Sequence, residues 1–263
     1  MISRKWVYRS LIPLLISSTV LVGVGTRPVK ADSSLALDGT GSGIDCQASD
    51  CVAQQLTTDQ ADDVILLFVL TSSDTTTLTI SDSSGLDFTQ HLSYASESFP
   101  GGTIWEYYAV ASSPLDSDNI SVVPDQCCYI IRGMQVLGIS GADTSTIYDP
   151  DPSVPATVSC PSDACGDCYA DANTNPGTCS ASVQTSGVAF VIAATLINDA
   201  PSCGGYSYSP AEYQPPPGFT MISSPNGNFE VDYTITNSSS YVEFDCNGTD
   251  ATAIVVDAII ASD

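Results

Sequence analysis

Two pairs of acidic residues are the closest approach to catalytic chemistry in this chain of 263 residues. Glu230 with Asp232, and Glu243 with Asp245, each place two carboxyl groups on one face of a strand, because side chains two positions apart share a face. Two carboxyl groups are what glycoside hydrolysis requires. Both pairs lie on the polar side of an alternating segment, where solvated carboxylates are expected. We therefore expect no enzyme.

A serine protease-like triad needs a histidine, and His91 is the only one in the chain. No Ser stands in the Gly-x-Ser-x-Gly pattern that exposes a nucleophile on a sharp turn. We therefore interpret His91 as a structural side chain close to Tyr94.

Oxygen ligands for Ca²⁺ could come from Asp143, Asp149 and Asp151, which surround a Pro-rich turn. The alternative is an ordinary extended loop, since short Asp side chains are also frequent turn formers. No cofactor other than this possible calcium ion is expected.

The cysteines number ten, an even count that favours disulfides in an oxidising compartment. Cys46 and Cys51 can close a small loop. Four more stand close together and pair most simply among themselves, with three possible connectivities, or form a zinc knuckle: Cys160, Cys165, Cys168 and Cys179. Adjacent residues of a strand point to opposite faces, so Cys127 and Cys128 are expected to pair with Cys203 and Cys246 in some order.

Two other sets of residues suggest surface chemistry. Tyr206, Tyr208 and Tyr213 flank a run of three prolines, where aromatic rings can stack on sugars or pack the loop against a sheet. Asn-x-Ser/Thr sequons, which accept N-linked glycans in exported proteins, occur at Asn119, Asn237 and Asn247.

The N-terminal stretch predicts export. Basic residues precede a short apolar run from Leu11 to Val24, and small residues at Val29 and Ala31 predict a signal peptide spanning residues 1–31. A membrane anchor is the alternative, but this run is shorter than the ~20 apolar residues of a spanning helix. Cleavage would leave Arg132 as the single basic residue against 30 Asp and Glu. So acidic a surface repels nucleic acid and anionic membranes.

Beyond residue 45 we expect one domain, 46–263, preceded by an extended segment, 32–45. Short β-rich runs separated by Ser, Asp, Gly and Pro clusters predict an all-β antiparallel sandwich, jelly-roll-like, with a disulfide-rich insertion loop at 150–184. No internal repeat is evident. Three runs are apolar on both faces: Val64 to Leu70, Val188 to Leu196, and Ala253 to Ile260. Their outer faces need a cover, either the insertion loop or a neighbouring subunit.

Four segments carry a resemblance to a known group of proteins. They are Ala61-Asp62-Asp63-Val64-Ile65, Asp82-Ser83-Ser84-Gly85-Leu86, Trp105-Glu106-Tyr107-Tyr108-Ala109-Val110-Ala111 and Ile139-Ser140-Gly141-Ala142-Asp143-Thr144-Ser145. In this order they resemble β-sandwich modules of secreted archaeal and bacterial cell-surface proteins, of the filament or adhesin type. The likeness extends over most of residues 35–263. It implies a β-sandwich at the cell surface and no catalytic residues.

The function expected from these observations is a structural subunit of an extracellular cell-surface filament or coat. Six residues that follow the predicted cleavage site alternate in a way that suits a strand added to a neighbouring copy: Asp32, Ser33, Ser34, Leu35, Ala36 and Leu37. The partners would then be copies of the same chain. The alternative is a secreted carbohydrate-binding or adhesive module that acts as a monomer.

Overall fold

The computed structural model describes residues 34–42, 53–72, 77–96, 101–124, 131–160, 178–198, 203, 215–223, 229–247 and 250–262. The predicted signal peptide lies outside these residues. Residues 32–263 form one compact unit. Among the described residues, no helix has the length and apolar character that crossing a membrane requires.

The first half of the chain folds into eight described strands. They are β1 (Ala36–Thr40), β2 (Ala53–Leu56), β3 (Asp63–Ser72), β4 (Leu78–Ser81), β5 (Thr89–Ala95), β6 (Gly102–Ala111), β7 (Asp118–Pro124) and β8 (Ile131–Ser140). The apolar run from Val64 to Leu70 lies within β3, where the pattern predicted a strand. The segment expected to be merely extended contains β1.

The second half contributes seven more. They are β9 (Ala156–Ser159), β10 (Thr178–Gln184), β11 (Ala189–Asn198), β12 (Thr220–Ser223), β13 (Phe229–Ile235), β14 (Tyr241–Asn247) and β15 (Asp250–Ile260). β9 and β10 fall inside the segment expected to be an insertion loop at 150–184. Both are paired sheet strands, so the loop interpretation is wrong at both ends of that segment, whereas residues 161–177 are outside the described part.

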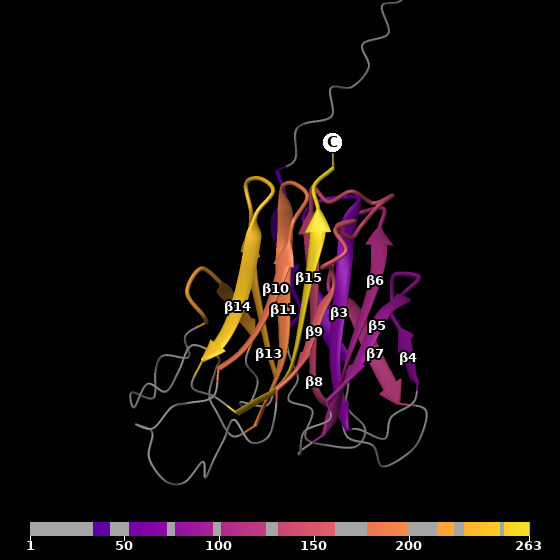
Figure 1. The fold of residues 1–263 in the computed structure, drawn as a ribbon. Coiled ribbons are helices and arrows are strands. Elements are labelled where there is room, and N and C mark those ends of the chain that lie inside the picture. The colour runs from indigo at the N-terminus through magenta and orange to yellow at the C-terminus, as the bar shows by residue number, and fades with distance from the viewer. Residues whose placement is uncertain are drawn as a thin grey trace, which may run out of the picture. The chain divides into compact units, whose positions relative to one another are not determined.

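These strands build four antiparallel layers, seen from one side in Figure 1. A five-stranded sheet from the first half, in the order β1-β8-β3-β6-β5, faces a five-stranded sheet from the second half, in the order β12-β13-β11-β15-β9. The three-stranded sheet β2-β7-β4 lies on the outer side of the first large sheet, and the pair β10-β14 lies on the outer side of the second. The expected all-β antiparallel class is confirmed.

Apolar packing connects each layer to the next. The main core lies between the two large sheets and includes Phe68, Leu137, Phe190, Phe229 and Val255. A second core packs β11 and β15 against β10 and β14, and a third packs β3 and β6 against β2 and β7. The central strands are apolar on both faces because the chain covers both faces itself. Neither an insertion loop nor a neighbouring subunit is required as a cover.

The two halves repeat the same connectivity. In the first half, the large sheet contains the strand order β1-β8-β3-β6 and the small sheet has the order β2-β7-β4. Successive strands thus alternate between the two sheets as they do in a jelly roll, with β5 added beside β6. In the second half β9-β15-β11-β13 and β10-β14 occupy the corresponding places, with β12 beside β13. The jelly-roll arrangement thus occurs twice, and the two copies pack through their larger sheets.

Register and side-chain contacts support this repeat. Val64 pairs with Ile139 and Val110, and Phe190 pairs with Ile259 and Ile235 at the same place in the other sheet. Two buried threonines, Thr58 and Thr185, exchange the same pair of hydrogen bonds with the backbone of Leu115 and Ser240 respectively. The fold therefore repeats in its two halves although no repeat is evident in the sequence.

Candidate functional site

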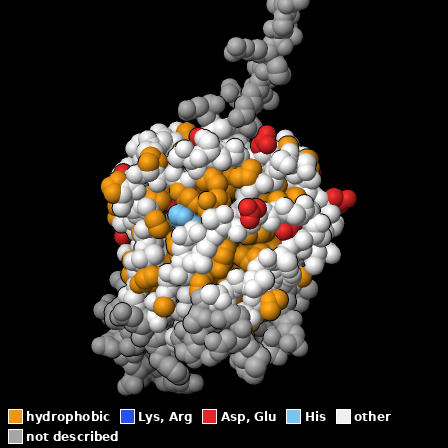
Figure 2. Space-filling view, turned by 90° about the vertical axis from the view of Figure 1, so that its right-hand side faces the viewer, with side chains coloured by type: hydrophobic (Ala, Val, Ile, Leu, Met, Phe, Trp, Pro, Cys, Tyr) orange, Lys and Arg blue, Asp and Glu red, His pale blue; other side chains and the backbone are white. Residues whose placement is uncertain are grey.

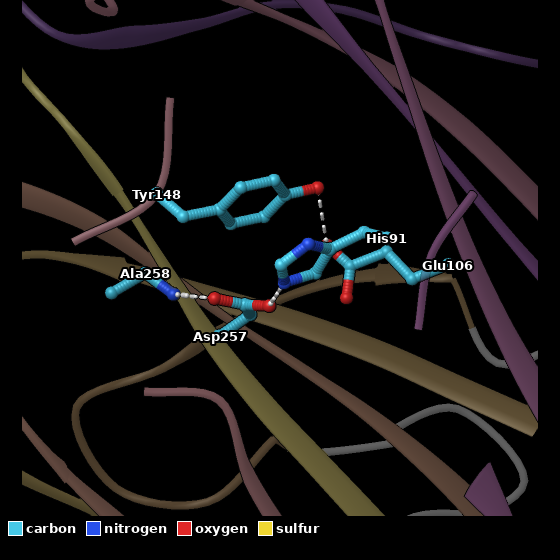
Figure 3. A network of polar contacts seen from close by, with 5 residues as sticks. All are labelled: His91, Glu106, Tyr148, Asp257 and Ala258. Atoms are coloured by element: carbon cyan, nitrogen blue, oxygen red, sulfur yellow. Dashed lines mark hydrogen bonds and ion pairs between the residues drawn. The ribbon is translucent and has the colours of Figure 1, made fainter. Parts of the chain in front are cut away.

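A cluster of polar side chains interrupts the main core where the two halves meet. It contains His91 from β5, Glu106 from β6, Asp257 from β15 and Tyr148 from the segment before β9 (Figure 3). We call this location the seam. Glu106 and Asp257 are fully buried, whereas the His91 side chain keeps 22% of its surface exposed. In Figure 2 the pale blue histidine reaches the surface among apolar side chains, and no Lys or Arg shows on that face.

Strand geometry explains how these side chains meet. Glu106 follows Ile104 by two positions, and Asp257 follows Val255 by two, so both carboxyl groups point into the main core. His91 precedes Leu92, which also contacts that core, and simple alternation would turn the imidazole away. The pairing of β5 with β6 shifts register between Gln90 and Leu92. A bulge of this kind redirects a side chain, and here it allows His91 to reach Asp257.

Distances define the contacts within the cluster. His91 Nε2 lies 3.0 Å from Asp257 Oδ2. Asp257 Oδ1 accepts a hydrogen bond of 2.7 Å from the backbone N–H of Ala258, and Glu106 Oε1 accepts one of 3.2 Å from the Tyr148 hydroxyl. The His91 and Tyr148 rings stack with centroids 3.5 Å apart and planes 7° from parallel. Each side chain is therefore held in one orientation.

Burial controls the protonation of the two carboxyl groups. It raises the pKa of Glu106 well above its usual value, and the charge of Asp257 raises it further. Burial also raises the pKa of Asp257, while its hydrogen bond and charge interaction with His91 work in the opposite direction. Two carboxylates so close together resist being ionised at the same time. The pair therefore tends to share a proton or to require a cation.

The repeated fold shows what these positions hold in the other copy. Leu137 corresponds to Asp257, because they pair with Leu66 and Ile192 at equivalent places in β3 and β11. Val231 corresponds to Glu106, and Ile222, also at a register shift, corresponds to His91. Leu37 takes the place of Tyr148. The same fold accommodates aliphatic side chains at all four positions, so the polar cluster is not a requirement of the fold.

A second acidic pair differs from its expected setting. Glu230 and Asp232 point to the outer side of β13 and are fully buried, so the expectation of solvated carboxylates is wrong. Burial raises the pKa of Glu230 to about 7, and burial together with the charge of Glu230 raises that of Asp232 to about 10. The backbone N–H of Cys203 donates to both Glu230 oxygens, at 3.2 and 3.1 Å. Of the other pair, Glu243 is exposed and Asp245 is half-buried.

The three aspartates considered for Ca²⁺ accept hydrogen bonds from turns of the chain itself. Asp143 Oδ1 accepts hydrogen bonds from Ser145 and Thr146, and Asp151 Oδ1 accepts two from Ser153. Asp149 Oδ2 accepts two from Ser186. Within the part of the chain that the structure describes, the group of ligand atoms close enough to share an ion is instead His91, Glu106 and Asp257.

Two disulfides are present among the described residues. Cys160 pairs with Cys179, which is one of the pairings expected within the Cys-rich segment and removes both residues from a zinc knuckle. Cys203 pairs with Cys246, so the expected pairing of these two with Cys127 and Cys128 is wrong. The reason is topological, since Cys203 follows β11 and Cys246 lies on β14, both in the second half. Six cysteines lie outside the described residues: Cys46, Cys51, Cys127, Cys128, Cys165 and Cys168.

The remaining predicted residues divide between described and undescribed parts. Leu35 is buried in the main core and Leu37 packs against it, while Ser34 is exposed. Asn119 and Asn237 are exposed, as a glycan acceptor must be. Asp32, Ser33, Tyr206, Tyr208, Tyr213 and the side chain of Asn247 lie outside the described residues.

Comparisons with protein-family models, curated proteins and solved structures find no match for this chain. The site must therefore be judged on its own geometry. Sequence reasoning missed the cluster because it treated His91 in isolation. A signal was present in the strands themselves, since Glu106 and Asp257 are charged residues inside strongly apolar strands.

Proposed function

We propose that this protein is a structural subunit of an extracellular surface filament or coat, and that copies join by exchanging β1. In this arrangement β1 of one copy takes the place of β1 in the next. Exchange of an identical element between copies is a low-cost route to assembly, because each contact made within one chain is made again between chains.

The position of β1 is the observation that carries this proposal. β1 is the first described strand, and it lies at the edge of its sheet with β8 as its single neighbour. Leu35 and Leu37 fill the main core from this strand. Removal of β1 would expose both a row of backbone groups on β8 and an apolar groove, which is the acceptor that a donated strand recognises.

Beyond β1, a side chain forms hydrogen bonds with the backbone along the same edge of β8. The Gln54 side chain accepts a hydrogen bond of 2.8 Å from Val136 N–H and donates one of 2.5 Å to Met134 C=O, as a strand backbone would. Gly41 N–H donates to Val136 C=O at 2.8 Å. Because Gln54 stays with its own sheet, exchange involves β1 alone and leaves a defined groove.

A cysteine trap tests whether β1 pairs within a chain or between chains. Ala36 and Ser140 are direct partners of β1 and β8, and Ser159 and Ala253 are the comparable partners of β9 and β15. We expect Ala36→Cys with Ser140→Cys to give a covalent ladder of multimers on a denaturing gel without reductant. The matched control, Ser159→Cys with Ala253→Cys, should give cross-linked monomers.

Deletion of residues 32–40 provides a second readout. The shortened chain should stay soluble and lose polymerisation, and a synthetic peptide of residues 32–42 should bind it and restore its thermal stability. Covalent monomers only in the cysteine trap, together with normal filaments from the deletion variant, would contradict the proposal. A monomer that binds a glycan array in a manner sensitive to Tyr206 and Tyr208 would support the carbohydrate-binding alternative instead.

A further inference from the structure

We propose that His91, Glu106 and Asp257 bind one divalent transition-metal ion of the zinc class at the seam. The ion would join β5 and β6 of the first half to β15 of the second. This inference is independent of strand exchange, because β1 contributes none of the three ligands.

Three ligand atoms converge at one point, where His91 Nε2 and Asp257 Oδ2 lie 3.0 Å apart and Glu106 Oε2 has no hydrogen-bond partner among the described residues. All three atoms are buried and lie within 4.8 Å of one another (Figure 3). Buried polar atoms in proteins are nearly always hydrogen-bonded, so the unpartnered Glu106 Oε2 beside the contact between His91 and Asp257 indicates that something else binds there. A bound cation would satisfy all three.

The other atoms of each ligand are already engaged. Ala258 N–H holds Asp257 Oδ1 at 2.7 Å, the Tyr148 hydroxyl holds Glu106 Oε1 at 3.2 Å, and the Tyr148 ring stacks on the imidazole. Supporting contacts of this kind orient metal ligands in proteins. The remaining atoms, His91 Nε2, Glu106 Oε2 and Asp257 Oδ2, are therefore the ones turned toward the common point.

The ligand types select the class of ion. One imidazole nitrogen and two carboxylate oxygens suit Zn²⁺ and related transition metals, whereas Ca²⁺ and Mg²⁺ prefer oxygen ligands in larger number. Three protein ligands leave room for a water molecule, and the partly exposed His91 marks the side from which water and the ion can enter. A double positive charge also balances the two buried carboxylates, which otherwise need a proton.

The equivalent place in the repeated fold, formed by β12 and β13 of the second half and β8 of the first, provides the reference for this inference. Ile222, Val231 and Leu137 occupy the three corresponding positions and contact the same core. A core position that accepts Val or Leu in one copy and holds Glu or Asp in the other has gained a charge that costs free energy on burial. Metal binding supplies the compensation.

Titration of the metal-stripped, processed chain with Zn²⁺ tests the proposal. We expect one ion bound per chain, with a higher thermal midpoint, and little competition from excess Mg²⁺. Glu106→Gln should lower the affinity at least tenfold. Tyr148→Phe, which keeps the stacked ring and removes the hydroxyl, should lower it by about tenfold, at the lower end of what supporting residues contribute. Glu243→Gln, on an exposed carboxylate of β14, is the control for weak binding to the acidic surface and should leave the affinity unchanged.

The repeat also offers a designed replacement. The triple variant His91→Ile, Glu106→Val and Asp257→Leu copies the equivalent residues Ile222, Val231 and Leu137 and should bind no zinc at this stoichiometry. If wild type and Glu106→Gln bind Zn²⁺ equally, or if zinc leaves the thermal midpoint of the wild type unchanged, the proposal is overturned. Both comparisons hold even if the triple variant fails to fold.

Discussion

Asp38 and Asp149 perform the same task at equivalent places in the two halves. Asp38 Oδ2 accepts the backbone N–H groups of Asp59 and Gln60, each at 2.8 Å, and so anchors the turn before β3. Asp149 Oδ2 accepts the N–H of Ser186 at 2.8 Å and its hydroxyl at 3.0 Å, and so anchors the turn before β11. The pair extends the structural repeat from strand pairing to the side chains that hold the turns.

Loss of either carboxylate should therefore weaken the fold to a similar extent. We expect Asp38→Ala and Asp149→Ala each to lower the free energy of unfolding by about 1.5–3 kcal/mol, the range for hydrogen bonds to charged groups. Urea denaturation followed by tryptophan fluorescence would measure this. Glu243→Gln, which alters an exposed carboxylate, should leave the midpoint unchanged. A similarly small effect for both Asp variants would contradict the shared role.

Stability should be greatest in acid and fall as the pH rises. Asp63 is fully buried at the start of β3, and burial, together with its hydrogen bond to Asp38 and the charges of Asp38 and Asp62, raises its pKa to about 8. A carboxyl group whose pKa is raised by folding stabilises the folded state fully at a pH below its pKa in the unfolded chain, which is near 4. That contribution to the free energy of unfolding is lost as the pH rises through the pKa in the folded protein, at up to about 1.4 kcal/mol per pH unit.

Asp63→Asn isolates this effect. The amide keeps the shape and stays neutral, so unfolding midpoints measured at pH 5, 6.5 and 8 should depend less on pH than those of the wild type. Glu230 and Asp232 should retain part of the dependence in both proteins. If the wild type became more stable from pH 5 to pH 8, the assignment of raised pKa values would be refuted.

Phe229 packs on the backbone of Gly133 between the two large sheets. A Cβ atom added to Gly133 would lie 2.6 Å from Phe229 Cδ1, so no side chain fits there without displacing the ring. Gly133→Ala should destabilise the protein by about 1–3 kcal/mol, as overpacked cores do. Gly187→Ala is the matched control, since a Cβ atom at that residue would meet no atom within 4 Å, and it should be close to neutral. Thermal unfolding of the two variants distinguishes the packing effect from a general loss of glycine.

The loss of stability on removing each disulfide should increase with the length of the loop that the disulfide closes. Cys203 and Cys246 are 43 positions apart, and Cys160 and Cys179 are 19 apart. Chain-entropy reasoning then predicts losses of about 4 and about 3 kcal/mol for the respective double Cys→Ala variants. Peptide mapping without reductant checks the pairing itself. Recovery of Cys203 linked to Cys127 or Cys128 would contradict the structure.

The sequence predicted the central strands well because their signal is local. Alternation identifies β13, and unbroken apolar runs identify β3, β11 and β15. Alternation separates the two faces of a strand but does not reveal what covers each face. Glu230 and Asp232 were therefore assigned to solvent although the chain covers that face of β13.

The repeat and the seam could not be predicted in the same way. Equivalent positions carry residues as different as His91 and Ile222, or Glu106 and Val231, so the similarity lies in register and connectivity. The cluster also depends on a bulge at His91 and on strands far apart in the chain. These features appear only once strand pairing is known.

The packing of two alike halves has a consequence for how such an architecture can arise. One jelly roll alone would leave its larger sheet uncovered on the main-core side, and a second copy related by two-fold symmetry would cover it. In such a homodimer every position occurs twice, so a buried charge would carry a double cost. Joining the copies in one chain removes that constraint, because the two equivalent places can then differ. The seam can hold polar side chains while the equivalent place stays apolar, with Leu37, Leu137, Ile222 and Val231.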